Sequence, residues 1–270
     1  MSLISKILKP LAGAAALTAI ATVAAQPADA FTFTFGGSVA GDNSGLTTAV
    51  SGAHVVTFND IPVGTAIGNN DVLPNPPSAL PFTLPNGVAT YSAPEVDGRV
   101  GRVVVGNETG RFRAPGQVIV GNPPQDLDPA LDNLTNYLTL GSPLERGPVT
   151  ISFRGPARLN YFGLYLGSID GFNRIRFFNG TNLLGTVTGG QILAALGPNT
   201  PSGRVTQYVN FFASNKSQLF DRIELISASP SLESDNHAFR VVPTPALVPA
   251  ALGFAGAMLR KRKKEAGVKA

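Results

Sequence analysis

Acidic residues at close spacing are the side chains in this 270-residue chain that could bind a metal ion. The first group, in a proline-rich stretch, consists of Asp126, Asp128 and Asp132. The second group lies just before the last predicted strand and consists of Glu233, Asp235 and Asn236. Such oxygen ligands suit calcium, which takes about 6 to 8 oxygens. The first group lacks the sixth-position Gly and the twelfth-position Glu of an EF-hand loop. Solvated carboxylates are therefore the alternative explanation for these residues.

A sugar could bind at Asp170-Gly171-Phe172-Asn173, which separates two strand-like stretches. Phe172 could stack on a sugar ring while Asp170 accepts hydrogen bonds from its hydroxyl groups. Asp and Asn are also common in tight turns, because their side chains bond the backbone two residues on. A purely structural turn is the alternative, and burial of Phe172 in the core would exclude the sugar site.

Motifs for covalent or cofactor chemistry are absent from the sequence. There is no Gly-x-Ser-x-Gly elbow, phosphate loop or dinucleotide fingerprint. The chain has no cysteine, which excludes thiolate nucleophiles and Cys-ligated zinc, and its histidines, His54 and His237, do not have metal-binding spacing. We therefore expect a non-enzymatic protein. A polysaccharide hydrolase or lyase that uses a pair of carboxylates is the alternative.

The elements that must position these residues are short β-strands. Alternating or β-branched stretches bounded by Gly, Pro, Asn and Asp predict strands near residues 31–35, 54–58, 87–91, 99–105, 117–120, 134–140, 149–153, 157–166, 173–178, 183–187, 205–212, 220–226 and 237–242. The three rings of Phe31, Phe33 and Phe35 should share one strand face. Residues 191–196 predict one or two helical turns, and residues 62–87 carry enough proline to predict irregular chain.

Strands at this spacing, without a sustained helical period, predict an all-β fold. We expect an antiparallel β-sandwich of the jelly-roll type over residues 31–242 as one domain. A small N-terminal subdomain ending near residue 145 is the alternative. In such a sandwich, Glu233, Asp235 and Asn236 precede the last strand, where a structural calcium ion is often held.

The N-terminal segment has the features of a signal peptide. Lys6 and Lys9 precede an apolar helix-forming run over residues 11–25, and Ala28-Asp29-Ala30 provides an A-x-A cleavage site. We expect cleavage after Ala30, with a signal anchor as the alternative.

The C-terminal segment, residues 243–270, has three parts: Pro243-Thr244-Pro245-Ala246, a short apolar helical run over residues 247–259, and a basic cluster over residues 260–264. The apolar run is shorter than the roughly 20 residues of a stable membrane span. The basic cluster should stay on the cytoplasmic side of a membrane. The preceding chain would then lie outside.

The two ends account for the basic character of the chain, whose pI is about 9.5. Eight of the 21 Lys and Arg and two of the 17 Asp and Glu lie in these ends. Residues 31–242 therefore keep 13 basic and 15 acidic residues, a net charge of −2. Scattered Arg residues with no basic cluster argue against a nucleic-acid-binding surface.

The signal peptide, the β-rich body, the Pro-x-Pro-Ala element, the short apolar run and the basic tail together resemble the PEP-CTERM class of bacterial sorted proteins. Residues 243–246 look like the PTPA variant of that motif, with Thr244 where the commonest form carries Glu. The resemblance implies export and transient retention in the inner membrane. Recognition by an exosortase-type membrane protease and delivery to the cell surface or extracellular matrix would follow. A plain C-terminal membrane anchor is the alternative.

A second resemblance lies within the body. It rests on five stretches that look like a block found in exosortase-sorted surface proteins: residues 148–153, 161–165, 167–170, 173–178 and 235–236. That block is similar to β-sandwich domains of the carbohydrate-binding type. The resemblance implies a surface protein, with extracellular polysaccharide as a candidate ligand.

Overall fold

The computed structural model describes residues 31–67, 79–93, 101–116, 132–141, 148–155, 158–229 and 231–242. The predicted signal peptide with Ala28 and Ala30 lies outside the described residues. Asp126, Asp128 and the segment from Pro243, with its sorting motif and apolar run, lie outside them as well. Within the described part, no helix is long and apolar enough to span a membrane.

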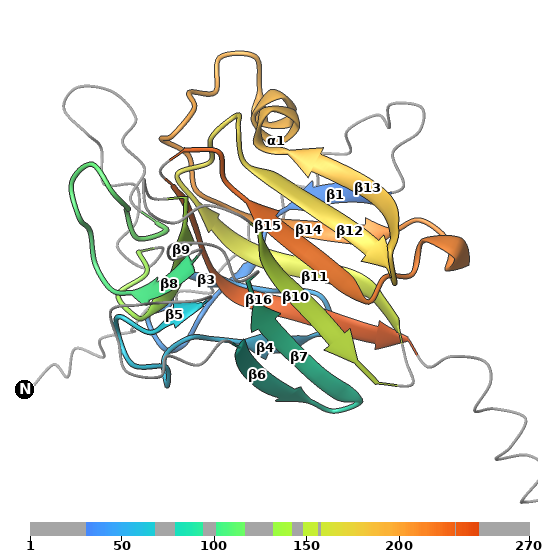
Figure 1. Cartoon of the computed structure of the whole chain (residues 1–270). Helices are drawn as coiled ribbons and strands as arrows, with labels where there is room; N and C mark the ends of the chain where they lie inside the picture. Colours follow the sequence, from blue (N-terminus) through green and yellow to red (C-terminus); the bar gives the residue numbers. More distant parts are fainter. Residues whose placement is uncertain are drawn as a thin grey trace, which may run out of the picture.

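Two antiparallel sheets form the body of the protein, as predicted (Figure 1). The first sheet has the strand order β1 (Phe31–Phe35), β14 (Gln207–Ala213), β11 (Arg158–Gly167), β16 (Leu232–Val242), β9 (Tyr137–Leu140), β8 (Gly101–Val104) and β5 (Ala66–Ile67), and β4 (His54–Val56) also pairs with β16. The second sheet has the order β13 (Asn182–Thr188), β12 (Arg174–Asn179), β15 (Arg222–Ile226), β10 (Val149–Arg154), β7 (Gly87–Ser92) and β6 (Ala79–Leu84).

The later strands alternate between the sheets: β10, β12, β13 and β15 lie in the second sheet, while β11, β14 and β16 lie in the first. Such crossing connections are typical of a jelly-roll-like sandwich. The remaining elements are a two-stranded ribbon of β2 (Ser38–Val39) and β3 (Leu46–Thr47), the helix α1 (Gly189–Leu196) and a 3-10 turn, η2 (Lys216–Gln218).

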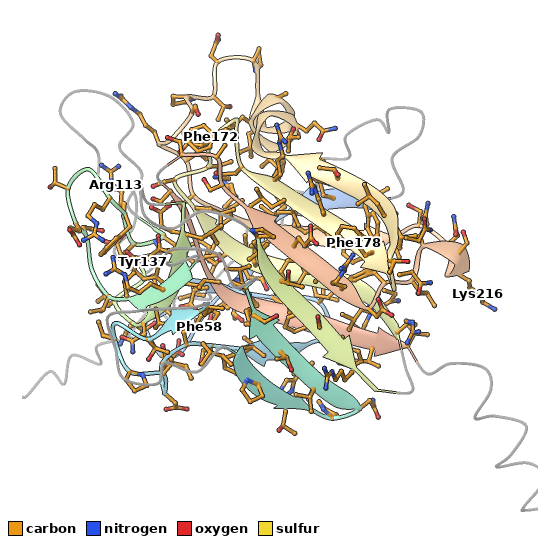
Figure 2. All side chains as sticks on the ribbon, in the orientation of Figure 1. Phe58, Arg113, Tyr137, Phe172, Phe178 and Lys216 are labelled. Atoms are coloured by element: carbon orange, nitrogen blue, oxygen red, sulfur yellow. The ribbon has the colours of Figure 1, made fainter. Side chains whose placement is uncertain are left out.

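Aromatic side chains fill much of the space between the sheets. The rings of Phe31 and Phe177 stack with their centroids 4.1 Å apart, and Phe177 also contacts Phe211 and Phe220. Phe31 is buried, and Phe33 and Phe35 pack against the same core, as the alternation of β1 predicts. Phe58 lies in this core as well (Figure 2). This packing holds the two sheets face to face.

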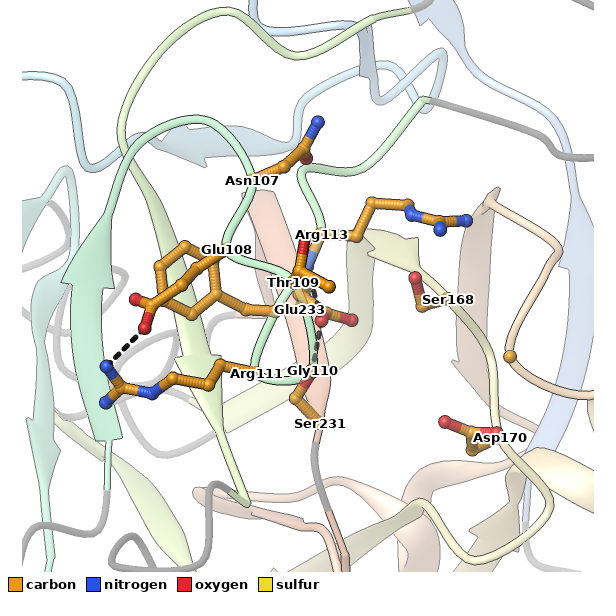
Figure 3. Close-up of a pocket in the computed structure, with 12 residues that line it drawn as sticks. Asn107, Glu108, Thr109, Gly110, Arg111, Arg113, Ser168, Asp170, Ser231 and Glu233 are labelled. Atoms are coloured by element: carbon orange, nitrogen blue, oxygen red, sulfur yellow. Dashed lines mark hydrogen bonds and ion pairs between the residues drawn. The ribbon is translucent and has the colours of Figure 1, made fainter.

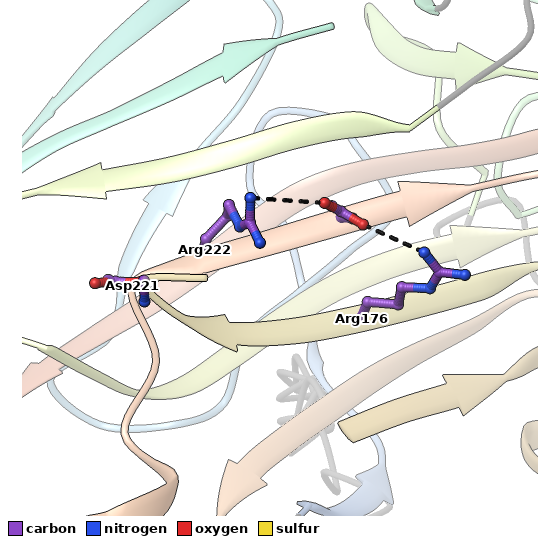
Figure 4. A network of polar contacts seen from close by, with 5 residues as sticks. Arg176, Asp221 and Arg222 are labelled. Carbon is purple, nitrogen blue, oxygen red and sulfur yellow. Dashed lines mark hydrogen bonds and ion pairs between the residues drawn. The ribbon is translucent and has the colours of Figure 1, made fainter. Parts of the chain in front are cut away.

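The outer face of the second sheet is polar. Glu224 on β15 lies between two guanidinium groups, 3.6 Å from Arg176 and 3.9 Å from Arg222 (Figure 4). Arg222 also lies over the ring of Phe178, 3.9 Å from its centroid. Because only the inner face of this sheet meets the core, its strands show the alternating burial that the sequence predicts.

Two sequence predictions about the strands are wrong. Residues 62–87 were expected to be irregular, but they contain β5 and β6; β6 is an edge strand, where Pro81 costs no ladder hydrogen bond. The last strand was expected to begin at His237, but β16 begins at Leu232 and includes five polar residues, 233–237. The candidate functional site includes residues from this stretch.

The Phe177 ring is central to the core, and its removal should leave a cavity among Phe31, Phe211 and Phe220. We predict that Phe177→Ala lowers the free energy of unfolding by about 3–5 kcal/mol. Leu183→Ala on β13 is the control, because Leu183 is half exposed and its truncation should cost less than about 1 kcal/mol. Urea denaturation measures both values. Equal losses for the two variants would contradict the assigned core.

Candidate functional site

The middle of β16 consists of five consecutive polar residues that are all buried: Glu233, Ser234, Asp235, Asn236 and His237, each at most 1% exposed. Buried polar groups are costly unless they are hydrogen-bonded. Their partners therefore show what surrounds this strand on each face.

A β-bulge divides these residues between the two faces of the first sheet. The register of β11 and β16 shifts between Gly163 and Tyr165, where Gly163 pairs with Ala238 and Tyr165 with Asp235. At the bulge, Asn236 has a positive φ of 49°, a conformation that Asn tolerates better than most residues. The bulge breaks the alternation of side chains along the strand. Asp235 and Asn236 therefore both face the covering loops, and His237 faces the core.

His237 points into the core between the sheets. Its Nδ1 lies 2.8 Å from the Tyr91 hydroxyl of β7, and its Nε2 lies 2.9 Å from the Ser234 hydroxyl. The ring also packs edge-on against Phe58 and Phe162. Burial lowers the pKa of His237 to about 3, so the imidazole is neutral near pH 7. This histidine is structural, as expected from the lack of metal-binding spacing.

Asp235 and Asn236 lie on the opposite face, beneath covering loops. Asp235 accepts hydrogen bonds from Asn133 Nδ2 at 2.7 Å and from the Asn236 backbone at 2.7 Å. The Asn236 amide donates to the carbonyl groups of Ser44 at 2.9 Å and Leu46 at 2.8 Å. Burial raises the pKa of Asp235 to about 7 despite these hydrogen bonds. These two side chains join the loops to the sheet.

A pocket of about 470 Å³ opens beside these residues (Figure 3). It lies between the turn after β8, the loop after β11 and the start of β16. Its lining is mostly polar and consists of Asn107, Glu108, Thr109, Gly110, Arg111, Phe112, Arg113, Ser168, Asp170, Gly203, Ser231 and Glu233.

Glu233 is the buried carboxyl of this pocket. Its Oε1 accepts hydrogen bonds from the Arg113 backbone at 2.9 Å and from the Ser231 hydroxyl. Its Oε2 is buried and has no hydrogen-bond partner among the described residues, and Figure 3 shows one carboxyl oxygen turned toward the hollow. Burial, with a smaller contribution from the charge of Asp170, raises the pKa of Glu233 to about 7. A buried carboxyl of this kind is a candidate for ligand binding or proton transfer.

Asp170 reaches the pocket from the loop between β11 and β12. The loop is anchored by Ile169, whose backbone donates to the Val205 carbonyl at 2.9 Å and accepts from Gly203 at 2.8 Å. Asp170 Oδ1 accepts from the Ser202 hydroxyl at 2.8 Å. Partial burial raises the pKa of Asp170, and the Ser202 hydrogen bond opposes that effect.

The turn that was predicted as a sugar site divides into separate environments. Phe172 is half-buried and belongs neither to the core nor to the pocket lining (Figure 2). Asn173 is buried: its Oδ1 accepts from the Ser227 hydroxyl at 3.0 Å, and its backbone donates to the Asp170 carbonyl at 3.0 Å. The Asn173 side chain packs inward as part of the turn and does not line the pocket with Asp170.

Glu233, Asp235 and Asn236, predicted together as calcium ligands, differ in their contacts. Glu233 lines the pocket, whereas Asp235 and Asn236 bond the loops that carry Ser44 and Asn133. Of the other predicted group, only Asp132 lies in the described part of the chain. No set of three His, Asp or Glu side chains placed to hold a metal ion occurs among the described residues.

Sequence reasoning missed the turn after β8, which supplies more than half of the pocket lining. In this turn, Glu108 and Phe112 form a small antiparallel bridge, and Gly110 adopts a positive φ of 76°. The Asn107 side chain closes it by accepting from the Ala114 backbone at 2.7 Å. The sequence signal was the cluster of charged residues Glu108, Arg111 and Arg113. Such a cluster does not show which strand the turn faces.

No protein-family model, curated protein or solved structure matches this chain at a significant level.

The raised pKa of Glu233 gives the protein a specific pH dependence. Between about pH 4.5, where an ordinary Glu titrates, and about pH 7, the folded state holds a proton that the unfolded state has released. The free energy of unfolding contributed by Glu233 therefore falls as the pH rises through this interval. Asp235 contributes in the same direction, and His237 contributes in the opposite direction between about pH 3 and 6.5.

The Glu233→Gln variant isolates this contribution, because it removes one titrating group and leaves the others. We predict that the wild-type free energy of unfolding falls by about 1–3 kcal/mol more than that of Glu233→Gln between pH 5 and pH 8. Urea denaturation at several pH values measures the difference, with Glu108→Gln as the surface control. Parallel curves for wild type and Glu233→Gln would contradict the burial of this carboxyl.

Proposed function

We propose that this protein is an exported cell-surface or extracellular-matrix protein, sorted by an exosortase-type membrane protease, that binds extracellular polysaccharide in the Glu233 pocket. Support for export comes from the Ala28-Asp29-Ala30 signal and from the C-terminal segment that begins at Pro243. Support for the ligand class comes from the pocket itself. The proposal assigns no nucleic-acid partner and no catalytic residue.

The observation that carries this proposal is the polar lining of the pocket around a buried acceptor. Its volume of about 470 Å³ is in the range of small-molecule sites. Glu233 Oε2 has no hydrogen-bond donor among the described residues, and carboxylate, amide and hydroxyl groups line the same pocket. A sugar is rich in hydroxyl groups that can donate and accept hydrogen bonds, so it suits this lining better than an apolar ligand does.

A polysaccharide hydrolase or lyase is the second candidate, and one observation favours it. Glu233 and Asp170 line the same pocket, and burial raises the pKa of Glu233 to about 7. A carboxylic acid that keeps its proton near neutral pH, beside a second carboxylate, is the arrangement that glycoside hydrolysis uses. In that case Glu233 would be the general acid and Asp170 the nucleophile or base.

A glycan array with the wild-type protein tests polysaccharide binding. We predict binding that Asp170→Asn weakens by about tenfold, because a charged acceptor for sugar hydroxyls becomes a neutral amide. Asp60→Asn is the matched control, since Asp60 is exposed and lies outside the pocket. Binding that Asp170→Asn leaves unchanged would place the ligand elsewhere. Release of reducing ends by the wild type, lost in Glu233→Gln, would favour the hydrolase.

The sorting part of the proposal has its own test. Replacing both Pro243 and Pro245 by Ala should keep the full-length chain in the inner-membrane fraction, because the protease would no longer recognise the motif. Expression in a bacterium with an exosortase, followed by fractionation and mass spectrometry, measures this. The matched control is Pro249→Ala, which lies beyond the motif in the apolar run. Equal release of both variants would contradict recognition at residues 243–246.

A further inference from the structure

The pocket contains one cationic side chain that no carboxylate of the described residues neutralises. Arg113 donates a backbone hydrogen bond to Glu233, but its guanidinium group forms no hydrogen bond or ion pair with another described residue. Arg111, two residues earlier in the same turn, is paired with Glu108 at 2.6 Å. Arg113 is therefore available for an anionic group of a ligand, whereas Arg111 is not.

Three carboxyl groups line the pocket, and none of them forms an ion pair with that guanidinium group: Glu108, Asp170 and Glu233. Figure 3 shows the Arg113 side chain extending above Ser168, with Asp170 below Ser168 and Glu233 across the hollow from Asp170, beside Gly110. Asp170 uses one oxygen for the Ser202 hydroxyl, and one oxygen of Glu233 has no donor within the described part of the chain. The pocket lining thus contains both carboxyl acceptors and a guanidinium group.

Building on the proposed function, we propose that the pocket binds a uronic acid residue of an anionic polysaccharide. The carboxylate of the sugar pairs with Arg113, and its hydroxyl groups donate to Asp170 and to the second oxygen of Glu233.

Three features of the pocket favour a uronic acid over other sugars. A guanidinium group matches a carboxylate in a bidentate pair, which is stronger and more directional than a neutral hydrogen bond. A neutral hexose would leave Arg113 without a counter-charge in a partly closed site. An amino sugar would place a second cation near Arg113 and leave the guanidinium unpaired.

The same geometry also predicts that salt affects the two kinds of ligand differently. Pairing between Arg113 and a ligand carboxylate is screened by salt, whereas hydroxyl hydrogen bonds to Asp170 and Glu233 depend on salt much less. Binding of a uronate oligomer should therefore weaken as the salt concentration rises, and binding of a neutral oligomer should stay nearly constant.

Isothermal titration at pH 7 with three oligosaccharides of equal length tests the proposal: an oligogalacturonate, a neutral hexose oligomer and an oligomer of glucosamine. We expect the full chain to bind the oligogalacturonate at least about tenfold more tightly than the other two. Arg113→Gln should lose that preference while keeping its affinity for the neutral oligomer. Arg174→Gln is the matched control and should bind like the wild type, because Arg174 is exposed on β12 and lies outside the pocket. Circular dichroism confirms that both variants fold.

The possible failures separate this proposal from the proposed function. Equal affinity for the uronate and the neutral oligomer would overturn the uronic acid assignment and leave polysaccharide binding standing. Tighter binding of the glucosamine oligomer would overturn it in the same way. A preference for uronate that Arg113→Gln retains would overturn the role of Arg113. Absence of binding to all three oligosaccharides, together with a negative glycan array, would overturn both proposals.

Discussion

The structure depends on a single constraint: a strand in the middle of a sheet carries five consecutive polar residues that are almost completely buried. Each of these side chains must find hydrogen-bond partners, because a buried polar group without one costs about 1–3 kcal/mol. Partners on the inner face come from the second sheet, through Tyr91. On the outer face the partners come from loops that cover the sheet: Ser44, Asn133 and the Arg113 backbone.

The pocket lies next to Glu233, a residue of this group whose side chain is not fully hydrogen-bonded to the described residues. Among the residues that the structure describes, Glu233 receives two donors on one oxygen and none on the other. The neighbouring Asp235, two residues on along the same strand, has donors from the protein on both of its carboxyl oxygens. The two acids are similarly buried but differ in their contacts. Asp235 links a loop to the sheet by hydrogen bonds, whereas Glu233 has one carboxyl oxygen that can still accept a hydrogen bond beside the pocket. A buried acceptor without a donor lowers the stability of the fold, so stability alone does not explain the arrangement at Glu233.

The sequence predicts much of the fold because alternation reports directly on which strand face is buried. It worked for β1 and β10, whose apolar residues recur at every second position. It failed for the first half of β16, because Glu233 to Asn236 are polar on both faces and look like a loop. Their burial results from hydrogen bonds to chain segments more than 100 residues away, such as Asn133 with Asp235. A local pattern contains no information about such partners.

Contacts between distant chain segments also explain why the sequence predicts only part of the candidate site. Asp170 and Glu233 were both selected from residue type, but as members of different sites, and only the strand register brings them to one pocket. Asn173 was selected for its place in the turn, and that same turn directs its side chain inward. The turn that carries Arg113 was not selected, because its role depends on facing β16 across the sheet.

The most direct test of the account is the protonation of Glu233 itself, followed by carbon-13 nuclear magnetic resonance of its carboxyl carbon across a pH titration. We predict a pKa of about 7 in the free protein, and a shifted pKa with oligogalacturonate bound, because a sugar hydroxyl and the uronate charge then lie close to this carboxyl. A pKa near 4.5 that the oligosaccharide does not change would contradict the claim that β16 keeps a buried acceptor for a ligand.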